Sequence, residues 1–314
     1  MNDTQPIVWV DGALVPADRA AVLALDHGIT VGDGVFETAE VRHGQVFART
    51  RHHDRMDRSL AGIGLAPLDR ARLDAGIDAV LAASREAHGE ALPLERLRYT
   101  VTGGRGPLGS GRYDTEPTYI VALAPDPGME GPTTVAVGPW RRNLHSTVTG
   151  LKTTSYAENA VMLLAGSKLG ATETLFATSE GDLCEGTGSN TFVVTDGVLR
   201  TPGLDRGPLA GVTRGLVIEW AREAGIEVRE EQVPMADLAT AEEVFITSSI
   251  RSVQPVERLV EITESPLPTA PGLAAPVAPS EQYGVSFDRT LEVGPVTRRL
   301  QALIRENAAA TPDP

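Results

Sequence analysis

The sequence predicts an α+β (α/β) protein built from two domains. Runs with strand-like alternation and segments of helical periodicity occur in both halves of the chain. Between the halves, residues 124–132 collect three prolines and two glycines, which is typical of an interdomain linker. We therefore expect a small N-terminal α+β domain at residues 1–123 and a larger C-terminal domain at residues 133–314. A chain of 314 residues is long enough to give both domains a core.

The N-terminal domain should open with a β-hairpin, because Asp11-Gly12 separates two short apolar runs. A strand should follow at residues 35–41. Apolar residues at helical spacing predict helices from about residue 50 and over residues 73–81, and two more strands flank a glycine-rich loop at residues 103–112. One face of the strand at residues 35–41 carries every second residue: Val35, Glu37, Ala39 and Val41.

The C-terminal domain combines strands and helices in the same way. Residues 264–280 hold five prolines and no apolar periodicity, so we expect an exposed irregular insertion there. The last residues, 308–314, are expected to fray. Strands are predicted at residues 133–140, 174–178, 191–195, 227–230 and 243–249, and helices at residues 155–169, 213–220 and 295–304.

Composition restricts the classes of partner. A net charge of −14 argues against nucleic-acid binding, which needs concentrated positive charge. The one cysteine, Cys184, excludes a disulfide framework within the chain and fits a reducing compartment. His52 and His53 are adjacent on a helix and would not face one ion, so no metal site is expected. The N-terminus lacks a signal-peptide pattern and no apolar run reaches the roughly 20 residues that span a bilayer, so we expect a cytoplasmic protein.

Lysine is nearly absent from this chain, which has Lys152 and Lys168 against 26 arginines. The codon bias of a GC-rich genome, which favours arginine over lysine on surfaces, explains most of that difference. It does not explain Lys152, which follows a segment without charge, whereas Lys168 lies near the end of a predicted helix and should be an ordinary solvated side chain. Unlike a guanidinium, a lysine amine can lose its proton and attack a carbonyl, so Lys152 is the candidate nucleophile.

Four other motifs are weak when taken singly. Gly211 precedes a predicted helix, where backbone amides can bind a phosphate, but such turns are common. Ser248 and Ser249 end a strand and could simply begin a turn. Arg55 lies on a charged helix, and Glu185 lies near a glycine-rich loop, so each could be a solvated side chain without a task.

Taken together and in order, these motifs resemble those of the class IV (fold type IV) pyridoxal-phosphate enzymes. That group contains branched-chain and D-amino-acid aminotransferases, (R)-amine transaminases and 4-amino-4-deoxychorismate lyases. The resemblance covers nearly the whole chain and implies a two-domain fold whose larger domain has a barrel-like sheet. Six motifs carry it: GDGVFET (32–38), HHDRM (52–56), KTTSYAEN (152–159), CEGTGSNTF (184–192), LAGVTR (209–214) and FITSSIRSVQPV (245–256).

The resemblance also implies a role for each matching residue. Lys152 would hold the aldehyde of pyridoxal 5′-phosphate as a Schiff base and then move a proton. Glu185 would keep the pyridine nitrogen protonated, and Tyr156 would bind the phenolic oxygen. The cofactor phosphate would be bound by Arg55, by the backbone amides of Val212 and Thr213 with the Thr213 hydroxyl, and by Ser248 and Ser249.

The exact reaction is left open by these motifs, since elimination and transamination use the same lysine and carboxylate. The set of Thr38, Arg105 and the motifs after Lys152 most resembles 4-amino-4-deoxychorismate lyases, which release pyruvate and 4-aminobenzoate. Thr38 would position the substrate, and Arg105 would bind its carboxylate, with Arg96 or Arg98 as alternatives. A D-amino-acid or (R)-amine transaminase comes second, a branched-chain aminotransferase third, and a non-catalytic family member last. The resemblance further implies a small-molecule amino substrate and a homodimer.

Overall fold

The computed structural model describes residues 5–19, 21–129, 131–264 and 271–314. The chain forms two compact units. The first comprises Met1–Gly128, Leu151–Tyr156 and Ala308–Pro314, and the second comprises Met129–Gly150 and Ala157–Asn307. Two short segments from later in the chain therefore join the first unit, whereas the sequence-based division placed all of residues 133–314 in one domain.

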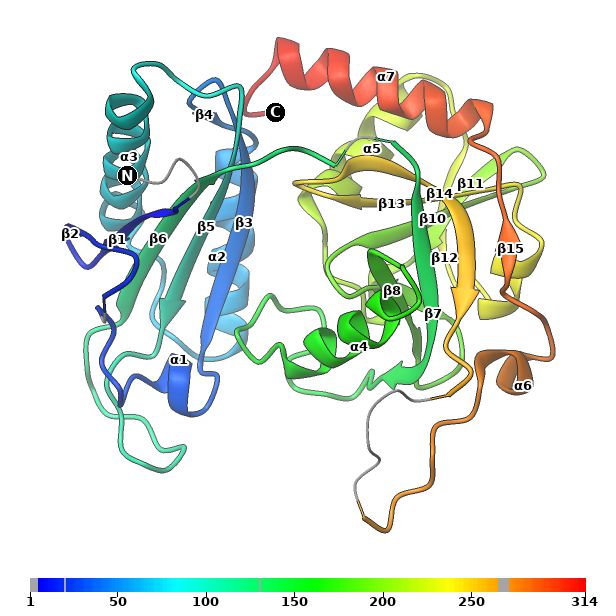
Figure 1. Ribbon diagram of the computed structural model, residues 1–314, viewed down its shortest axis with the longest axis horizontal. Coiled ribbons are helices and arrows are strands. Elements are labelled where there is room, and N and C mark those ends of the chain that lie inside the picture. The colour runs from blue at the N-terminus through cyan, green and yellow to red at the C-terminus, as the bar shows by residue number, and fades with distance from the viewer. Residues whose placement is uncertain (1–4, 20, 130, 265–270) are drawn as a thin grey trace. The chain divides into compact units, whose positions relative to one another are not determined.

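The first unit contains a six-stranded antiparallel sheet with the strand order β2-β1-β6-β5-β3-β4. Two helices, α2 and α3, cover one face of this sheet (Figure 1). The expected hairpin at Asp11-Gly12 is present between β1 and β2. The elements of the unit are β1 (Ile7–Val10), β2 (Ala13–Val15), α1 (His27–Thr30), β3 (Gly34–Arg42), β4 (Gln45–Val46), α2 (Arg49–Gly62), α3 (Arg70–His88), β5 (Leu94–Thr102) and β6 (Thr118–Pro125).

The core of the first unit follows the alternation of its strands. Every second residue of β5 is buried, because successive side chains point to opposite faces of the sheet. The buried face packs against apolar residues of α2 and α3 such as Met56, Leu60 and Ile77. The opposite face of β3 and β5 carries Phe36, Thr38 and Arg98, and this face holds the first group of candidate residues.

The second unit is built on a nine-stranded mixed sheet that curls into a half-barrel. Its strands follow the order β12-β11-β10-β13-β14-β7-β8-β9, with β15 paired to β14. The elements are β7 (Thr133–Arg142), α4 (Ala157–Ser167), β8 (Glu173–Thr178), β9 (Leu183–Gly186), β10 (Asn190–Thr195), β11 (Val198–Pro202), α5 (Val212–Glu223), β12 (Val228–Glu231), β13 (Glu243–Ser248), β14 (Ser252–Glu261), α6 (Pro279–Tyr283), β15 (Arg289–Thr290) and α7 (Pro295–Ala310), with 3-10 turns at Leu204–Arg206 and Met235–Ala239.

The core of the second unit gathers side chains from β7, β8, β10, β13 and β14, among them Val137, Leu175 and Ile246. These strands are buried along nearly their whole length, which is typical of strands covered on both faces. Among the described residues, no helix has the length and apolar character needed to cross a bilayer.

Two segments differ from the sequence-based expectation. Part of the proline-rich insertion at residues 264–280 (residues 265–270) lies outside the described residues, and its end forms the short helix α6. The expected fraying of residues 308–314 is wrong. Helix α7 continues to Ala310, and the residues after it contact the start of α2.

The C-terminal residues cap helix α2 in place of a local side chain. Ala48, the residue before this helix, has a left-handed φ of 52° and makes no side-chain cap hydrogen bond. Its amide donates to the Pro312 carbonyl at 2.8 Å, and Thr50 N donates to Asp313 Oδ1 at 3.0 Å. These bonds satisfy amides that the first turn of a helix leaves without an intrahelical partner. A carboxylate at this end also suits the helix dipole.

Candidate active site

Lys152 belongs to the first unit, where residues 151–156 run beside the start of β3. The Lys152 carbonyl accepts a hydrogen bond from Phe36 N at 3.0 Å, and the Lys152 amide donates to Ser59 Oγ of α2 at 3.2 Å. Two residues on, Thr154 N donates to the Gly34 carbonyl at 2.8 Å. The backbone of the candidate nucleophile is therefore held by β3 and α2.

The side chain of Lys152 meets two other candidate residues at the ring of Phe36. Lys152 Nζ lies 4.5 Å from the ring centroid, and the guanidinium carbon of Arg98 lies 3.7 Å from it. Tyr156 approaches the same ring edge-on, at 5.3 Å between centroids and 86° between planes. Cations are attracted to the electron-rich face of an aromatic ring, so Phe36 gathers the amine and the guanidinium.

The three candidate substrate arginines have different surroundings. Arg98 lies directly opposite Thr38 in the pairing of β3 with β5, beside the Phe36 ring. Burial by the surrounding protein lowers the pKa of Arg98, although its side chain keeps exposed surface. Arg96 instead donates to Asp126 at 2.7 Å. Arg105 is exposed on the loop after β5. Arg98, with Thr38 opposite it, therefore lies at the Phe36 ring together with Lys152, whereas Arg96 is bound to Asp126.

Arg55 lies on the opposite face of β3, in a buried cluster with Glu37 and His52. Arg55 Nε donates to Glu37 Oε1 at 2.8 Å, and Arg55 Nη2 donates to Glu37 Oε2 at 2.6 Å. His52 Nδ1 lies 2.8 Å from Glu37 Oε2. The Glu37 side chain has no exposed surface. The two bonds from one guanidinium fix the orientation of Arg55 as well as its charge.

The charges of this cluster follow from its burial and its partners. Burial alone would raise the pKa of Glu37, but the charge and hydrogen bonds of Arg55, together with those of His52, hold that pKa well below its ordinary range. Burial lowers the pKa of His52 despite the neighbouring carboxylate. The pKa of Arg55 is raised because Glu37 outweighs the effect of burial. The cluster therefore holds an ionised Glu37–Arg55 pair beside a neutral histidine.

Sequence reasoning missed Glu37 as a member of this group. The signal was present, since Glu37 shares one face of the predicted strand with the apolar residues Val35, Ala39 and Val41. A carboxylate on a buried face requires a partner, because an unpaired charge in a core is very unfavourable. The pattern therefore indicated a buried cation nearby, and that cation is Arg55.

In the second unit, Glu185 of β9 is bound to the turn that precedes α5. Glu185 Oε2 accepts a hydrogen bond from Leu209 N at 2.9 Å, and Arg142 Nη2 lies 3.5 Å from Glu185 Oε1. Arg142 also lies over the ring of Phe176, with its guanidinium carbon 4.2 Å from the centroid. The neighbouring Cys184 is buried, and burial raises the pKa of its thiol well above the ordinary value. Cys184 thus has the surroundings of an unreactive thiol.

The first turn of α5 presents backbone amides at the predicted phosphate motif. The helix begins at Val212 after Gly211, which has no side chain to cap it, and Thr213 is buried in the first turn. Asn190 Nδ2 donates to the Leu209 carbonyl at 2.9 Å and holds the preceding turn. A Cβ added at Gly211 would lie 1.9 Å from Asn190 Oδ1, so only glycine fits here. Such a helix start is suited to an anion.

Ser248 is the last residue of β13, and Ser249 follows it in the turn before β14. The pairing of β10 with β13 sets Asn190 opposite Thr247, one residue before Ser248. Ser248 Oγ accepts a hydrogen bond from Arg251 N at 3.1 Å and so closes the turn after the strand. Ser248 therefore stabilises a turn, as the alternative to phosphate binding predicted. It nevertheless lies close to Asn190 and to the turn before α5.

A second buried carboxylate, Glu173 of β8, was also missed from the sequence. It lies beneath the turn that follows Glu185. Glu173 accepts hydrogen bonds from Thr187 N at 2.8 Å, from the Thr187 hydroxyl, from Gly188 N at 3.2 Å and from Ser189 Oγ at 2.8 Å. The signal was an acidic residue directly before the predicted strand at residues 174–178, together with the segment rich in glycine and hydroxyl groups at residues 186–189.

Comparison with known proteins decides the family. Residues 34–259 match the model of the amino-transferase class IV family. The chain belongs to this family. The matched residues span β3 to β14 and include Lys152, Glu185 and the start of α5.

Relatives within the class IV family carry more than one activity name. The chain is 34% identical over 254 residues to a protein of Methanocaldococcus jannaschii named as a putative branched-chain-amino-acid aminotransferase, covering 79% of this chain and 86% of that one. It is 28% identical to the aminodeoxychorismate lyase of Bacillus subtilis, covering 82% and 87%. The structure of a fold IV transaminase from Curtobacterium pusillum matches with a TM-score of 0.75 and 27% identity, covering 96% and 99%.

Class IV enzymes depend on pyridoxal 5′-phosphate, and the chain is an enzyme of this kind. Its fold is fold type IV, as the resemblance implied. The chemistry of the described residues suits the cofactor in each unit: the first offers a lysine amine, and the second offers a carboxylate bound by a backbone amide and a glycine-led helix start for an anion. The substrate is a small amino compound.

Proposed function

We propose that this class IV enzyme is an aminotransferase that moves an amino group between an amino acid and a 2-oxo acid. The observation that carries the proposal is the position of Arg98, whose guanidinium shares the Phe36 ring with Lys152. An arginine there can bind the carboxylate of an amino acid whose amino group reacts near the lysine. The relative that is 34% identical and named as an aminotransferase supports transfer over elimination.

In this proposal Lys152 performs both the covalent step and the proton transfer. Its amine would hold the cofactor through the cofactor aldehyde and, once freed by the substrate amine, would carry a proton to or from the substrate carbon. Bound pyridoxal phosphate supplies a ring that accepts the electron pair left when the substrate C–H bond breaks. Glu185 keeps the pyridine nitrogen protonated, and the Leu209 amide and Arg142 hold that carboxylate in place.

The remaining candidate residues bind and orient. The amides of Val212 and Thr213 at the start of α5, together with Ser248 and Ser249, bind the phosphate. Arg55 serves the same phosphate, and its pair with Glu37 keeps the guanidinium charged and oriented.

The substrate side is formed by two groups near Phe36. Tyr156 lies edge-on to that ring and binds the phenolic oxygen of the cofactor, while Thr38 helps Arg98 to orient the substrate carboxylate. Arg96 has no part in substrate binding in this proposal, because its guanidinium is bound to Asp126.

Amino transfer is tested with the holoenzyme and a panel of donors. L-leucine, L-valine, D-alanine and (R)-1-phenylethylamine are each incubated with 2-oxoglutarate, and glutamate is resolved by chiral chromatography. We expect glutamate from at least one amino acid donor, and no glutamate when the 2-oxo acid is omitted. Absence of glutamate with every donor would overturn the proposal.

A second candidate is 4-amino-4-deoxychorismate lyase, which the sequence motifs ranked first. It is supported by the 28% identity to the Bacillus subtilis lyase over 82% of this chain. The same holoenzyme is given aminodeoxychorismate, and pyruvate and 4-aminobenzoate are measured. Formation of both products without any amino acid donor activity would select the lyase.

The family resemblance further supports a homodimer. One face of α4 exposes Val161, Leu163 and Leu164, each with at least 40% of its surface accessible, and such a face gains from being covered by a second copy. Light scattering of the holoenzyme should give the mass of two chains, and a single-chain mass would reject the dimer.

A further inference from the structure

Helix α2 begins without a cap from its own sequence. The residue before it, Ala48, makes no side-chain cap hydrogen bond and has a left-handed φ of 52°, which is unfavourable for alanine. The first turn contains Arg49 and Arg51 and no acidic residue, so its charges oppose the helix dipole. This end of α2 therefore depends on groups from elsewhere in the chain.

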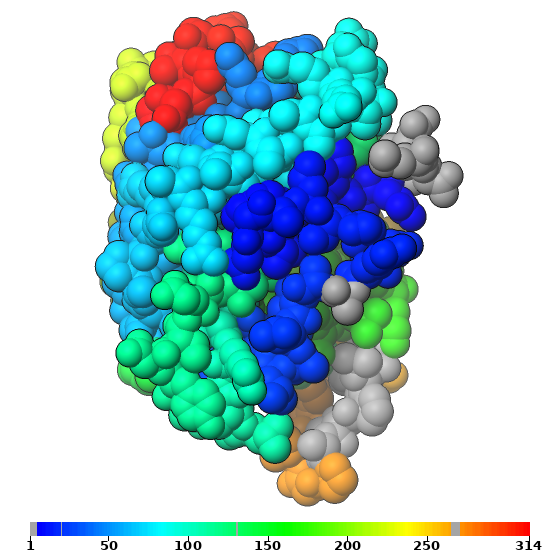
Figure 2. Space-filling view, turned by 90° about the vertical axis from the view of Figure 1, so that its left-hand side faces the viewer, coloured from blue at the N-terminus to red at the C-terminus, as the bar shows by residue number. Residues whose placement is uncertain are grey.

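The C-terminal tail, residues 312–314, supplies those groups. Asp313 accepts two hydrogen bonds from Thr50, one from its amide at 3.0 Å and one from its hydroxyl at 2.5 Å. The Pro312 carbonyl accepts a hydrogen bond from the Ala48 amide at 2.8 Å. Figure 2 shows the C-terminal end of the chain, in red, beside the segment around residue 50, in blue. Asp313 thus takes the place of a local N-cap side chain.

The start of α2 also carries His52, whose amide donates to the Ala48 carbonyl at 3.1 Å. His52 Nδ1 lies 2.8 Å from Glu37 Oε2, and the His52 side chain is 1% exposed. Glu37 is the carboxylate that binds Arg55 through two hydrogen bonds. A continuous set of contacts therefore leads from the C-terminal tail, through the start of α2, to the carboxylate that orients Arg55.

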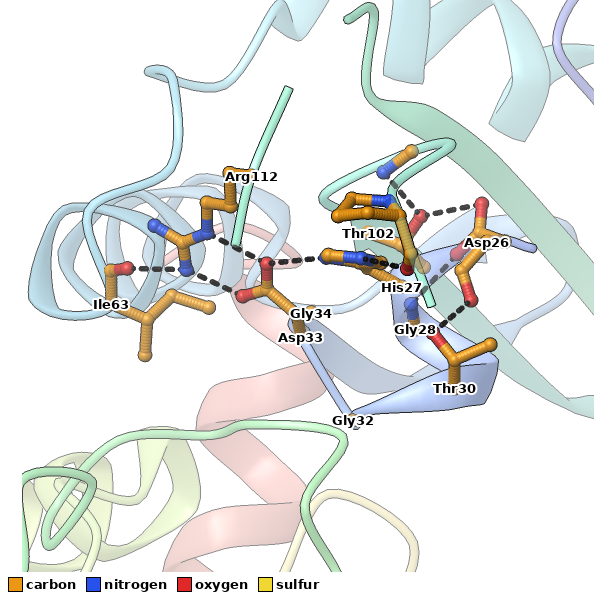
Figure 3. A network of polar contacts seen from close by, with 12 residues as sticks. Asp26, His27, Gly28, Thr30, Gly32, Asp33, Gly34, Ile63, Thr102 and Arg112 are labelled. Atoms are coloured by element: carbon orange, nitrogen blue, oxygen red, sulfur yellow. Dashed lines mark hydrogen bonds and ion pairs between the residues drawn. The ribbon is translucent and has the colours of Figure 1, made fainter. Parts of the chain in front are cut away.

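The other end of α2 is held by a different part of the chain. Arg112, at the end of the glycine-rich loop of residues 103–112, donates to the Ile63 carbonyl at 2.8 Å (Figure 3). The same guanidinium binds the Asp33 carboxylate, and the Asp33 carbonyl accepts from Gly103 N at 2.9 Å. A cation at this end suits the helix dipole, so both ends of α2 are capped by residues distant in sequence.

We propose that Asp313 is a positioning residue that holds the start of α2, and with it His52, against Glu37. The contact of His52 with Glu37 in turn keeps that carboxylate in place for Arg55. This inference rests on the proposed function, in which Arg55 binds the phosphate of the cofactor. Asp313 acts through this set of contacts and takes no part in the chemical step at Lys152. The C-terminal tail therefore helps to retain the cofactor.

The exposure of Asp313 makes this role testable, because Asp313→Ala removes no buried side chain and should fold. Asp313→Asn keeps an oxygen that can accept from the Thr50 amide, so it should behave nearly as the wild type does. Arg112→Ala removes the cap from the opposite end of the same helix. Glu306→Ala is the matched control, because it removes another exposed acidic side chain close to the C-terminus.

Three quantities are measured on the holoenzyme of each variant. They are the hydrogen exchange of the amides of α2, the exchange of the His52 ring hydrogen on Cε1 for deuterium, and the rate at which pyridoxal phosphate leaves during dialysis. For Asp313→Ala we expect the Thr50 and His52 amides and the His52 ring to exchange about fivefold faster, the usual effect of a lost N-cap on the opening of a helix end. The cofactor should leave about two- to fivefold faster, with kcat at saturating cofactor within about twofold of the wild type.

Arg112→Ala should speed amide exchange at residues 63–65 and leave the His52 ring exchange and the cofactor loss unchanged. Equal effects of Arg112→Ala and Asp313→Ala on these two quantities would show that Asp313 only stabilises the helix, and would overturn the positioning role. Unchanged His52 exchange in Asp313→Ala would overturn it too, as would unchanged cofactor loss or equal changes in Asp313→Asn or Glu306→Ala.

Failure of the proposed function has a different signature. The wild-type holoenzyme would then form no glutamate from any amino acid donor. The differences among the variants in His52 exchange and in cofactor loss would persist, and they would still support the role of Asp313.

Discussion

Glu37 and Arg55 form a two-bond ion pair in the core of the first unit, with donor–acceptor distances of 2.8 and 2.6 Å. The pair joins β3 to α2, so the helix that carries the candidate phosphate ligand depends on a carboxylate from the sheet. Removal of one member of such a pair leaves an uncompensated buried charge.

Glu37→Gln should destabilise the protein by about 3–5 kcal/mol, because Arg55 would keep its charge in the core without a counterion. Urea unfolding of the apoenzyme measures the change. Glu227→Gln is the control, since Glu227 binds Arg229 at the surface at 2.5 Å, and such a pair contributes about 0–1 kcal/mol. Equal losses in the two variants would contradict the importance of burial for the Glu37–Arg55 pair.

Acid should destabilise the protein through the same cluster. The pKa of His52 is lowered from its ordinary 6.5, so the folded state binds fewer protons than the unfolded state as pH falls below that value. The pKa of Glu37 is likewise lowered from its ordinary 4.5, so its contribution is present above pH 4.5 and is lost as pH falls further.

The pH effect is measured by urea unfolding between roughly pH 7.5 and pH 5, the range in which an ordinary histidine titrates. The free energy of unfolding should fall with pH in the wild type and fall less steeply in His52→Gln. Replacement of the exposed His145 by Gln should keep the wild-type slope. A slope unaffected by the His52 change would show that this histidine is not responsible.

Replacement of Lys152 should abolish turnover and the colour of the lysine-bound cofactor. Lys152→Ala should lose the absorption near 400 nm, an approximate value for this chromophore. Lys168→Ala is the matched control, because Lys168 is the only other lysine and is exposed on the surface. Borohydride treatment of the holoenzyme should attach the cofactor to the peptide that contains Lys152. Attachment at Lys168 would refute the assignment.

Replacement of Arg98 and replacement of Arg96 should have different effects on kcat/KM, although the two residues lie only two positions apart on β5. Arg98→Ala should lower kcat/KM for the amino acid about 10- to 100-fold, the usual cost of losing hydrogen bonds to a charged group. Arg96→Ala should change it by less than about threefold, because Arg96 is bound to Asp126. The reverse order would transfer the carboxylate-binding role to Arg96.

Gly211→Ala should weaken binding of the cofactor. The new Cβ would lie 1.9 Å from Asn190 Oδ1, so the turn before α5 must move and its amides with it. We expect the Kd of pyridoxal phosphate, from fluorescence titration of the apoenzyme, to rise roughly tenfold. Gly109→Ala, where a Cβ meets nothing within 4 Å, should bind as the wild type does. An unchanged Kd in Gly211→Ala would remove this helix start from the proposed phosphate site.

Local sequence patterns predicted much of this structure. The alternation at residues 35–41 corresponds to β3, the apolar periodicity at residues 213–220 to α5, and the Asp11-Gly12 dipeptide to the first hairpin. Each of these signals lies within a few neighbouring residues. The roles of the candidate site residues stay predictions, since they were carried over by resemblance.

Contacts between distant residues could not be predicted in the same way. Asp313 contacts Thr50 across 263 positions, and the sequence of the tail gives no sign of that partner. The pair of Glu37 with Arg55 was signalled only by a carboxylate on an apolar face. In the same manner, the choice between Arg96 and Arg98 depends on Asp126, which lies in the region predicted as a linker.

The attachment of the glycine-rich loop through residues 32–34 has a consequence for how such an enzyme can change over generations. The Lys152 segment is bound to the main-chain carbonyls of Gly32 and Gly34, whereas the loop is bound to Asp33 both at its main-chain carbonyl and at its side chain. Mutations in the loop can therefore accumulate without removing the bonds that hold the Lys152 segment. The two segments can change separately, although both are attached to adjacent residues of one short stretch of chain.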